Sequence, residues 1–202
     1  NPTKHFKNAF FLERKKYLNK NFEIKNYNKI LILGSGKSVA KNRIEIENFI
    51  RNNDVYVIVL NTTSNINEKF IDLRVACHPL RIISDLPLYK KLKTPILLPF
   101  SSFKSSVKKL IKRNKVNYID YGLKLNVDNK IFVNKNYCIL PSPLAIGYAL
   151  SVVSKIKEKR LFLAGFDGFD LSNPEIDDSE PVISSFIHNF FKIKPYTLTP
   201  SK

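Results

Sequence analysis

The sequence around Gly34-Ser35-Gly36 combines the residue types that bind phosphate groups in many α/β proteins. An apolar run, Ile30–Leu33, precedes the two glycines, and apolar residues at helical spacing follow from Ser38. Such a strand, turn and helix would present unpaired amides at a helix N-terminus, where phosphates and carboxylates bind readily. We therefore expect Gly34, Ser35, Gly36, Lys37 and Ser38 to contact the phosphates of a nucleotide-type ligand. The alternative is a tight turn that binds nothing.

Two well-known phosphate-binding motifs do not fit this turn. A Walker A loop would need a glycine at position 31, where the chain has leucine, so a P-loop NTPase is excluded. The dinucleotide fingerprint has glycines at its first two places but Val39 at the third. NAD is therefore a weak candidate ligand.

Further polar residues directly follow other predicted strands. Asn61 follows the β-branched run 55–60, and His78 and Arg81 follow a predicted strand over 73–77. Because ligands of open α/β sheets bind at the carboxyl ends of the strands, we expect Asn61 to contact the nucleotide and His78 and Arg81 to contact the substrate. An ordinary loop at Asn61 and a structural role for His78 are the alternatives.

The second half of the chain offers three more candidates. Ser142, followed by Pro143, is predicted to be the N-cap of a buried helix that extends to Val153, with free amides for a second anion. Asp167 follows the predicted strand 160–164, and His188 lies in a predicted helix over 182–191. We consider both as catalytic candidates. The acidic stretch 167–180 either binds Mg²⁺ or Ca²⁺ or is a solvated loop without a metal.

These candidates require an α/β framework that brings the ends of distant strands together. The pattern predicts one Rossmann-like domain over 29–202, with a mainly parallel sheet of about six strands and helices on both faces. Residues 1–28, which are basic and aromatic, are predicted to be a helical lead-in or linker. A helix is expected from Ser38 as N-cap to Arg51, and a short one over 86–92. Segments 118–120 and 130–133 are expected to be short strands or a hairpin insertion.

Composition limits the class of protein. The formal net charge is +17, but no block of five or six basic residues occurs, so specific nucleic-acid binding is not expected. The sequence contains no apolar run long enough to span a membrane and no signal peptide. Two cysteines far apart argue against a disulfide framework and a zinc site, and indicate a reducing cytoplasm. Methionine is absent, so we expect the chain to be part of a longer protein.

The order of these motifs resembles known families. The glycine turn, the strand ending in Asn61, the serine-started helix and the Gly165-Phe166-Asp167 turn are similar to the bacterial sialyltransferases of glycosyltransferase family 42 and to motility accessory factor proteins. The closest resemblance is to the C-terminal domain of two-part bacterial surface-polysaccharide proteins, whose N-terminal part resembles an aldolase of the HMG-CoA lyase type.

The resemblance implies a nucleotide-sugar ligand, with a CMP-type nucleotide favoured, bound by the glycine turn, Asn61 and Ser142. It also implies a role in lipopolysaccharide or capsule biosynthesis, with glycosyl transfer as the activity. The tyrosines that assist leaving-group departure in the sialyltransferases have no counterpart between Asp167 and Glu180. Two alternatives therefore stay open: a non-catalytic accessory module of an aldolase-like partner domain, or a pyrophosphokinase-like domain that requires Mg²⁺.

Overall fold

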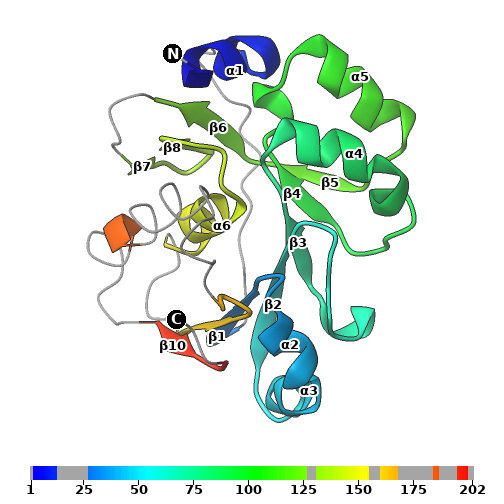
Figure 1. Cartoon of the computed structure of the whole chain (residues 1–202), viewed down its shortest axis with the longest axis vertical. Coiled ribbons are helices and arrows are strands. Elements are labelled where there is room, and N and C mark those ends of the chain that lie inside the picture. Colours follow the sequence, from blue (N-terminus) through cyan, green and yellow to red (C-terminus); the bar gives the residue numbers. More distant parts are fainter. Residues whose placement is uncertain are drawn as a thin grey trace.

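A parallel β-sheet runs through the centre of the molecule (Figure 1). The computed structural model describes residues 2–12, 27–126, 131–154, 160–167, 184–186 and 195–199. Within these residues the main sheet has seven strands, all parallel to their neighbours. Their order across the sheet is β10 (Tyr196–Thr197), β9 (Arg160–Ala164), β1 (Lys29–Leu33), β2 (Val55–Leu60), β3 (Leu73–Val75), β4 (Ile96–Leu98) and β5 (Tyr118–Asp120). The predicted Rossmann-like α/β fold is confirmed.

The strand order reverses beside β1. Strands β1 to β5 follow one another toward one edge of the sheet, whereas β9 and β10 are added on the other side of β1. Connections leave the sheet in opposite directions at such a switch point, and ligands of open α/β sheets bind at the carboxyl ends of the strands beside it.

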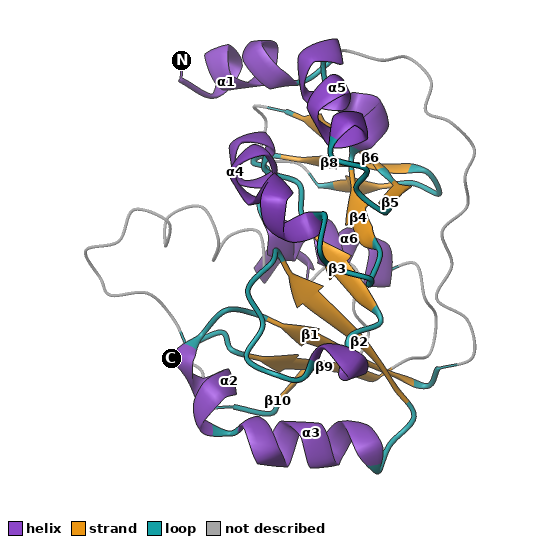
Figure 2. Cartoon of the chain, turned by 90° about the vertical axis from the view of Figure 1, so that its right-hand side faces the viewer, coloured by secondary structure: helices purple, strands orange, loops and turns teal. Residues whose placement is uncertain are grey.

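Both faces of the main sheet are covered, which explains its near-continuous apolar strands. Leu31 and Leu33 of β1 pack with Ile46 of helix α3 (Arg43–Arg51), which follows the short helix α2 (Lys37–Lys41). Helix α6 (Ala145–Val153) covers the opposite face and contacts β2 and β3. Figure 2 shows α4 and α5 in front of the sheet and α6 behind it.

Helix α4 (Pro79–Tyr89) begins seven residues before the helix predicted over 86–92, so that prediction was wrong. Pro79 occupies the first turn, where its missing amide costs nothing. Pro87 lies inside this helix, where a proline lacks the amide that would donate to the carbonyl four residues earlier. Pro87 lies in the last turn and is exposed, so the helix loses this hydrogen bond only near its end. Helix α5 (Ser105–Arg113) packs beside α4.

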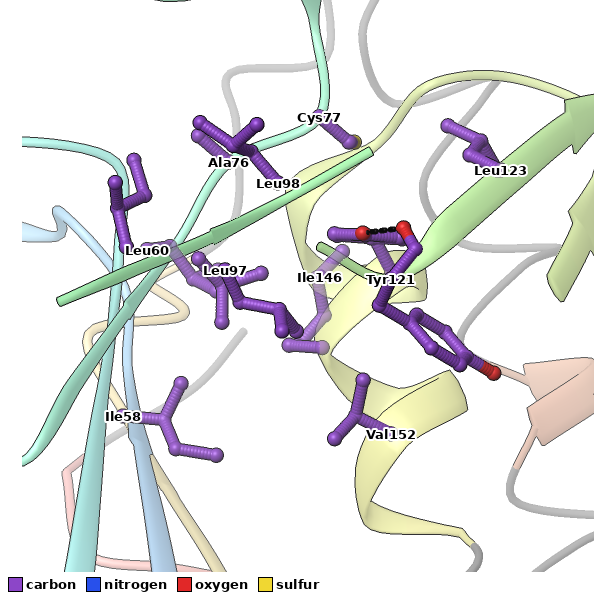
Figure 3. Packing of buried hydrophobic residues seen from close by; sticks show 14 of the residues in the cluster. Ile58, Leu60, Ala76, Cys77, Leu97, Leu98, Tyr121, Leu123, Ile146 and Val152 are labelled. Carbon is purple, nitrogen blue, oxygen red and sulfur yellow. Dashed lines mark hydrogen bonds between the residues drawn. The ribbon is translucent and has the colours of Figure 1, made fainter. Parts of the chain in front are cut away.

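A smaller sheet lies on the α6 side of the molecule. Its described strands are β6 (Gly122–Leu125), β8 (Tyr137–Leu140) and β7 (Phe132–Val133), in the order β6-β8-β7. The segment 118–120, expected to be a short strand or part of an insertion, is the edge strand β5 of the main sheet. In the core between sheet and helix, Leu97 and Ile146 point toward one another (Figure 3), and Tyr148 donates a hydrogen bond to the carbonyl of Tyr121.

Helix α1 (Pro2–Phe10) packs on the loops that follow β3 and β4. The Leu12 amide donates to the Ser102 carbonyl at 2.7 Å, in the short 3-10 helix Phe100–Ser102, and Phe11 is buried against Phe103 with ring centroids 5.4 Å apart. The described part of the expected lead-in therefore contributes to the core of the domain.

Candidate functional site

The turns after β1 and β9 meet at the switch point of the sheet. The Gly34 amide donates to the Ala164 carbonyl at 2.8 Å, and the Gly36 amide donates to the Gly165 carbonyl at 3.0 Å. These two bonds continue the pairing of the strands into the turns. The glycine turn and the Gly165 turn, both singled out in the sequence, therefore form one unit.

The carboxylate of Asp167 lies at the start of helix α2. One of its oxygens accepts a hydrogen bond from the Ser38 amide at 2.8 Å, and the other accepts one from the Ser38 hydroxyl. The side chain of Asp167 thus occupies the position at which we expected a ligand phosphate. The N-cap residue is Gly36, so the prediction of Ser38 as N-cap was wrong: Ser38 lies inside the helix and is buried.

The glycines of the two turns are required by their close approach. A Cβ atom at Gly36 would lie 2.5 Å from the nearer oxygen of Asp167 and 2.6 Å from the Gly165 carbonyl oxygen. At Gly34 it would lie 2.5 Å from the same carbonyl oxygen. Gly165 has φ +77°, which favours glycine, and its amide donates to the Thr199 hydroxyl at 3.0 Å. Packing of the turns therefore explains these glycines without a ligand. Ser35 and Lys37 are exposed.

The loop after β2 is rigidly held. Asn61 has φ 59°, a left-handed conformation that asparagine tolerates better than most residues, and its amide donates to the Val75 carbonyl at 2.9 Å. The guanidinium group of Arg74 donates to the carbonyls of Asn61 and Thr62 at 3.1 and 2.8 Å. Asn61 is therefore fixed at the carboxyl edge of the sheet, as a ligand-contacting residue requires.

Arg74 is a residue whose role the sequence analysis missed. It lies in strand β3 with 1% of its surface exposed, and it forms an ion pair of 2.6 Å with Glu68, in the short 3-10 helix Glu68–Phe70. A buried arginine needs such partners, because an unpaired buried charge is costly. The signal was available: an arginine is the second residue of the otherwise apolar run 73–77.

Arg81 is held in a fixed orientation at the same edge. Its Nε donates to Asp85 Oδ2 at 2.8 Å, and the Thr62 hydroxyl donates to the same oxygen at 2.8 Å. Ser84 donates to the other oxygen of Asp85 at 3.2 Å. Asp85 is buried, whereas the side chain of Arg81 is 50% exposed. Sequence analysis identified Arg81 but missed Asp85 and Thr62; the spacing of Arg81 and Asp85, four residues apart on one helix, was the available signal.

A buried hydroxyl without a partner lies beside this network. Tyr89 is 3% exposed, and among the described residues nothing hydrogen-bonds to its hydroxyl. Burial, with a smaller contribution from the charge of Asp85, raises the pKa of Tyr89. The hydroxyl therefore stays protonated and can donate a hydrogen bond.

Ser142 lies near the first turn of α6, but it is not the N-cap, as we had predicted. Leu144 is the N-cap, with an extended conformation, and the helix begins at Ala145. Packing accounts for the difference, because Leu144 adopts an extended conformation and packs its side chain against the core. The Ser142 hydroxyl is buried and has no hydrogen-bond partner in the described part of the chain. Since α6 returns the chain toward the start of β9, its first turn, and Ser142 with it, lies at the carboxyl edge.

His78 also lies at the carboxyl edge, between β3 and α4. Its ring packs against Phe6 of α1, with ring centroids 5.0 Å apart, and the residue is half-buried. The aromatic helix at the N-terminus therefore covers one side of this candidate.

His188 and the acidic residues 170–180 lie outside the described residues. Within the described ranges, no group of three or more His, Cys, Asp or Glu side chains is arranged to hold a metal ion. In that same part of the chain, no helix is both long and apolar enough to cross a membrane.

The described candidates thus gather at one edge of the sheet, in two places. Gly34, Gly36, Ser38 and Asp167 meet at the switch point, and Asn61, His78 and Arg81 follow β2 and β3. Comparison of the chain with family models, curated proteins and solved structures gives no match. The function is therefore inferred from the geometry of this edge and from the sequence.

Proposed function

We propose that the carboxyl edge of the main sheet binds a small anionic molecule of the nucleotide or nucleotide-sugar class, with Arg81 contacting its phosphate. The observation that carries the proposal is the orientation of Arg81. Buried Asp85 holds its Nε, while the side chain stays half exposed at the edge where parallel sheets bind ligands. An arginine fixed in this way loses little conformational freedom when it binds an anion.

The switch point and Arg81 are far enough apart to favour an elongated ligand. Strand β3, which leads to Arg81, lies two strand spacings from β1, or about 10 Å across the sheet. Asn61 lies between them, at the end of β2. A nucleotide-sugar can contact both places with different groups, whereas a free phosphate cannot.

The phosphate is assigned to Arg81 because the glycine turn already holds a carboxylate. The amide and hydroxyl of Ser38 are hydrogen-bonded to Asp167. A ligand phosphate at that position would have to displace a negatively charged side chain of the protein. The glycine turn then forms one side of the binding edge, and Arg81 supplies the positive charge.

The particular ligand and activity that we propose depend on the resemblance of the sequence to known families. We propose that the ligand is a CMP-type nucleotide-sugar, that the chain acts in bacterial surface-polysaccharide biosynthesis in the cytoplasm, and that glycosyl transfer is the activity. Cys77 and Cys138 are both free thiols, which fits a reducing compartment. The accessory module of an aldolase-like enzyme and the Mg²⁺-dependent pyrophosphokinase remain the alternatives.

A thermal-shift screen against CMP, CDP, UDP, GDP, ADP and NAD, with and without Mg²⁺, tests the binding proposal. A nucleotide at a hundred times its Kd stabilises the folded chain by about 2.7 kcal/mol, or on the order of 5–10 °C. For the nucleotide that responds, calorimetry then compares the wild-type chain with variants at the site.

Arg81→Ala should weaken binding roughly ten- to a hundredfold, the value of charge-assisted hydrogen bonds. Arg81→Lys should restore little, because lysine cannot donate to Asp85 and to the phosphate in the same geometry. Arg113→Ala, an exposed arginine at the end of α5, is the matched control. No response to any nucleotide, or equal affinity of the Arg81→Ala and Arg113→Ala variants, would refute the proposal.

A further inference from the structure

The segment from Leu86 to Ile119 carries an unusual charge. It contains nine lysine and arginine residues and no aspartate or glutamate, so it supplies about half of the formal net charge of +17. The segment extends from the last turn of α4, through β4 and α5, into β5. Arg81 and the glycine turns of the candidate ligand site lie outside this segment.

The fold gathers most of these charges at the amino edge of the main sheet. Strands β4 and β5 are neighbours, so the loops that precede them lie side by side. The Ile96 amide donates to the Asn117 carbonyl at 3.0 Å, and the Asn117 side chain donates to the Lys93 carbonyl at 3.4 Å. We define the basic edge as the six exposed cationic residues at these loops and the ends of α4 and α5: Lys90, Lys91, Lys93, Lys112, Arg113 and Lys115.

Two exposed leucines accompany the basic edge. Leu88 lies in the last turn of α4 and is 50% exposed, and Leu110 lies one turn before the end of α5 and is 36% exposed. The two helices pack against each other. A single exposed leucine is ordinary, but two leucines on helices whose ends carry these six cations form an amphipathic surface. Glu68 is an acidic neighbour, since its carboxylate accepts a hydrogen bond from the Thr94 hydroxyl at 3.0 Å, but it is paired with Arg74.

The chemistry of this surface fits lipid better than nucleic acid. Lysine predominates, and lysine acts as a point charge toward phosphate, whereas arginine and open aromatic rings are the residues that contact bases. The aromatic ring of Phe100 is stacked on Tyr118 at 4.4 Å, and Lys108 and Lys112 lie over it at 5.7 Å. This ring is therefore covered and offers no platform for a base.

We propose that the basic edge binds the surface of a bilayer that contains anionic lipids, with Leu88 and Leu110 entering the headgroup region. Each cation near an anionic leaflet strengthens binding by roughly fivefold. The basic edge lies at the opposite end of the strands from the glycine turns. Bound in this way, the chain holds its carboxyl edge away from the membrane and open to small molecules.

Sedimentation of the whole chain with vesicles tests this proposal. The wild-type chain should bind vesicles that contain phosphatidylglycerol, should not bind vesicles of phosphatidylcholine alone, and should be released by salt. The triple variant Lys90→Gln, Lys91→Gln, Arg113→Gln should bind the anionic vesicles roughly a hundredfold more weakly. The double variant Leu88→Ser, Leu110→Ser should also bind more weakly, since it removes the apolar contact without changing the charge.

The matched control is Lys41→Gln, Lys124→Gln, Lys135→Gln, which removes three charges outside the basic edge. Its vesicle affinity should fall by only a few fold. Equal losses in the two triple variants would show attraction by net charge alone and would overturn the proposal. The proposal would also be overturned if the wild-type chain does not bind anionic vesicles but binds duplex or single-stranded nucleic acid through the basic edge. Nucleotide binding at Arg81 is measured on the same variants and does not depend on either result.

Discussion

Substitution of Gly36 by alanine tests whether the glycine turn is shaped by packing or by a ligand. The added Cβ would lie 2.5 Å from a carboxylate oxygen of Asp167 and 2.6 Å from the Gly165 carbonyl oxygen, so the turn after β9 must move. Overpacking costs about 1–3 kcal/mol, and a weakened charge-assisted bond to Ser38 adds about 1.5–3 kcal/mol at most. Because Asp167 is half-buried, we expect a total loss of about 2–4 kcal/mol.

Urea unfolding followed by circular dichroism measures this loss. With an m-value of about 2 kcal/mol/M, the midpoint should fall by about 1–2 M. Ser35→Ala, an exposed change in the same turn, should leave the free energy of unfolding within about 0.5 kcal/mol of the wild-type value. In an Asp167→Ala background, Gly36→Ala should cost less, because the nearest obstructing atoms are gone and only the Gly165 carbonyl remains.

Two results would refute this reasoning. One is a Gly36→Ala variant as stable as the wild-type chain. The other is a double variant, Gly36→Ala with Asp167→Ala, whose loss of stability equals the sum of the losses of the two single variants. A variant of unchanged stability that loses nucleotide binding would restore the original expectation that the turn holds a phosphate.

Three further outcomes are expected. Arg74→Met should lower the free energy of unfolding by about 2–4 kcal/mol, since it removes a buried ion pair and two hydrogen bonds to the loop after β2. A free energy from urea unfolding within about 0.5 kcal/mol of the wild-type value would contradict this. Burial by itself raises the pKa of Glu47, but hydrogen bonds from Asn67 and Arg43 outweigh it and lower the pKa. The stabilisation that ionised Glu47 gives the folded chain is thus present at neutral pH and is lost as pH falls through the folded-state pKa. Glu47→Gln should therefore be less stable than the wild-type chain at pH 7 and equal to it near pH 2. Urea unfolding at both pH values measures this difference. Burial raises the pKa of Cys77, so Ellman's reagent should label this thiol only after unfolding.

Local sequence patterns predicted much of the sheet correctly. The boundaries of β2 and β9 agree with the predicted strands, because unbroken β-branched and apolar runs leave little choice of structure. Helix α4 was placed wrongly because its buried face, with Ile82, Leu86 and Tyr89, begins before the predicted start at residue 86. Strand β6 was missed, since a four-residue run with one lysine carries too weak a pattern.

The candidate site was predictable in position but not in its connections. Polar residues after strands must lie at the carboxyl edge, so Asn61, His78 and Arg81 could be placed from sequence. The residues that hold them in place could not be identified from the sequence. Arg74 reaches the carbonyls of Asn61 and Thr62 from the next strand, and the Thr62 hydroxyl shares the carboxylate of Asp85 with Arg81. Such contacts depend on how neighbouring strands and helices are arranged.

By itself the sequence determined the fold class, the strands of the main sheet and the edge that carries the candidate residues, because these follow from periodicity and from the order of elements along the chain. The tertiary structure alone decided what occupies the first turn of α2. Ser38 and Asp167 are 129 residues apart, and they meet because β1 and β9 are neighbours at the switch point. An amide at a helix N-terminus attracts any negative charge within reach, and here the fold supplies one from the chain itself.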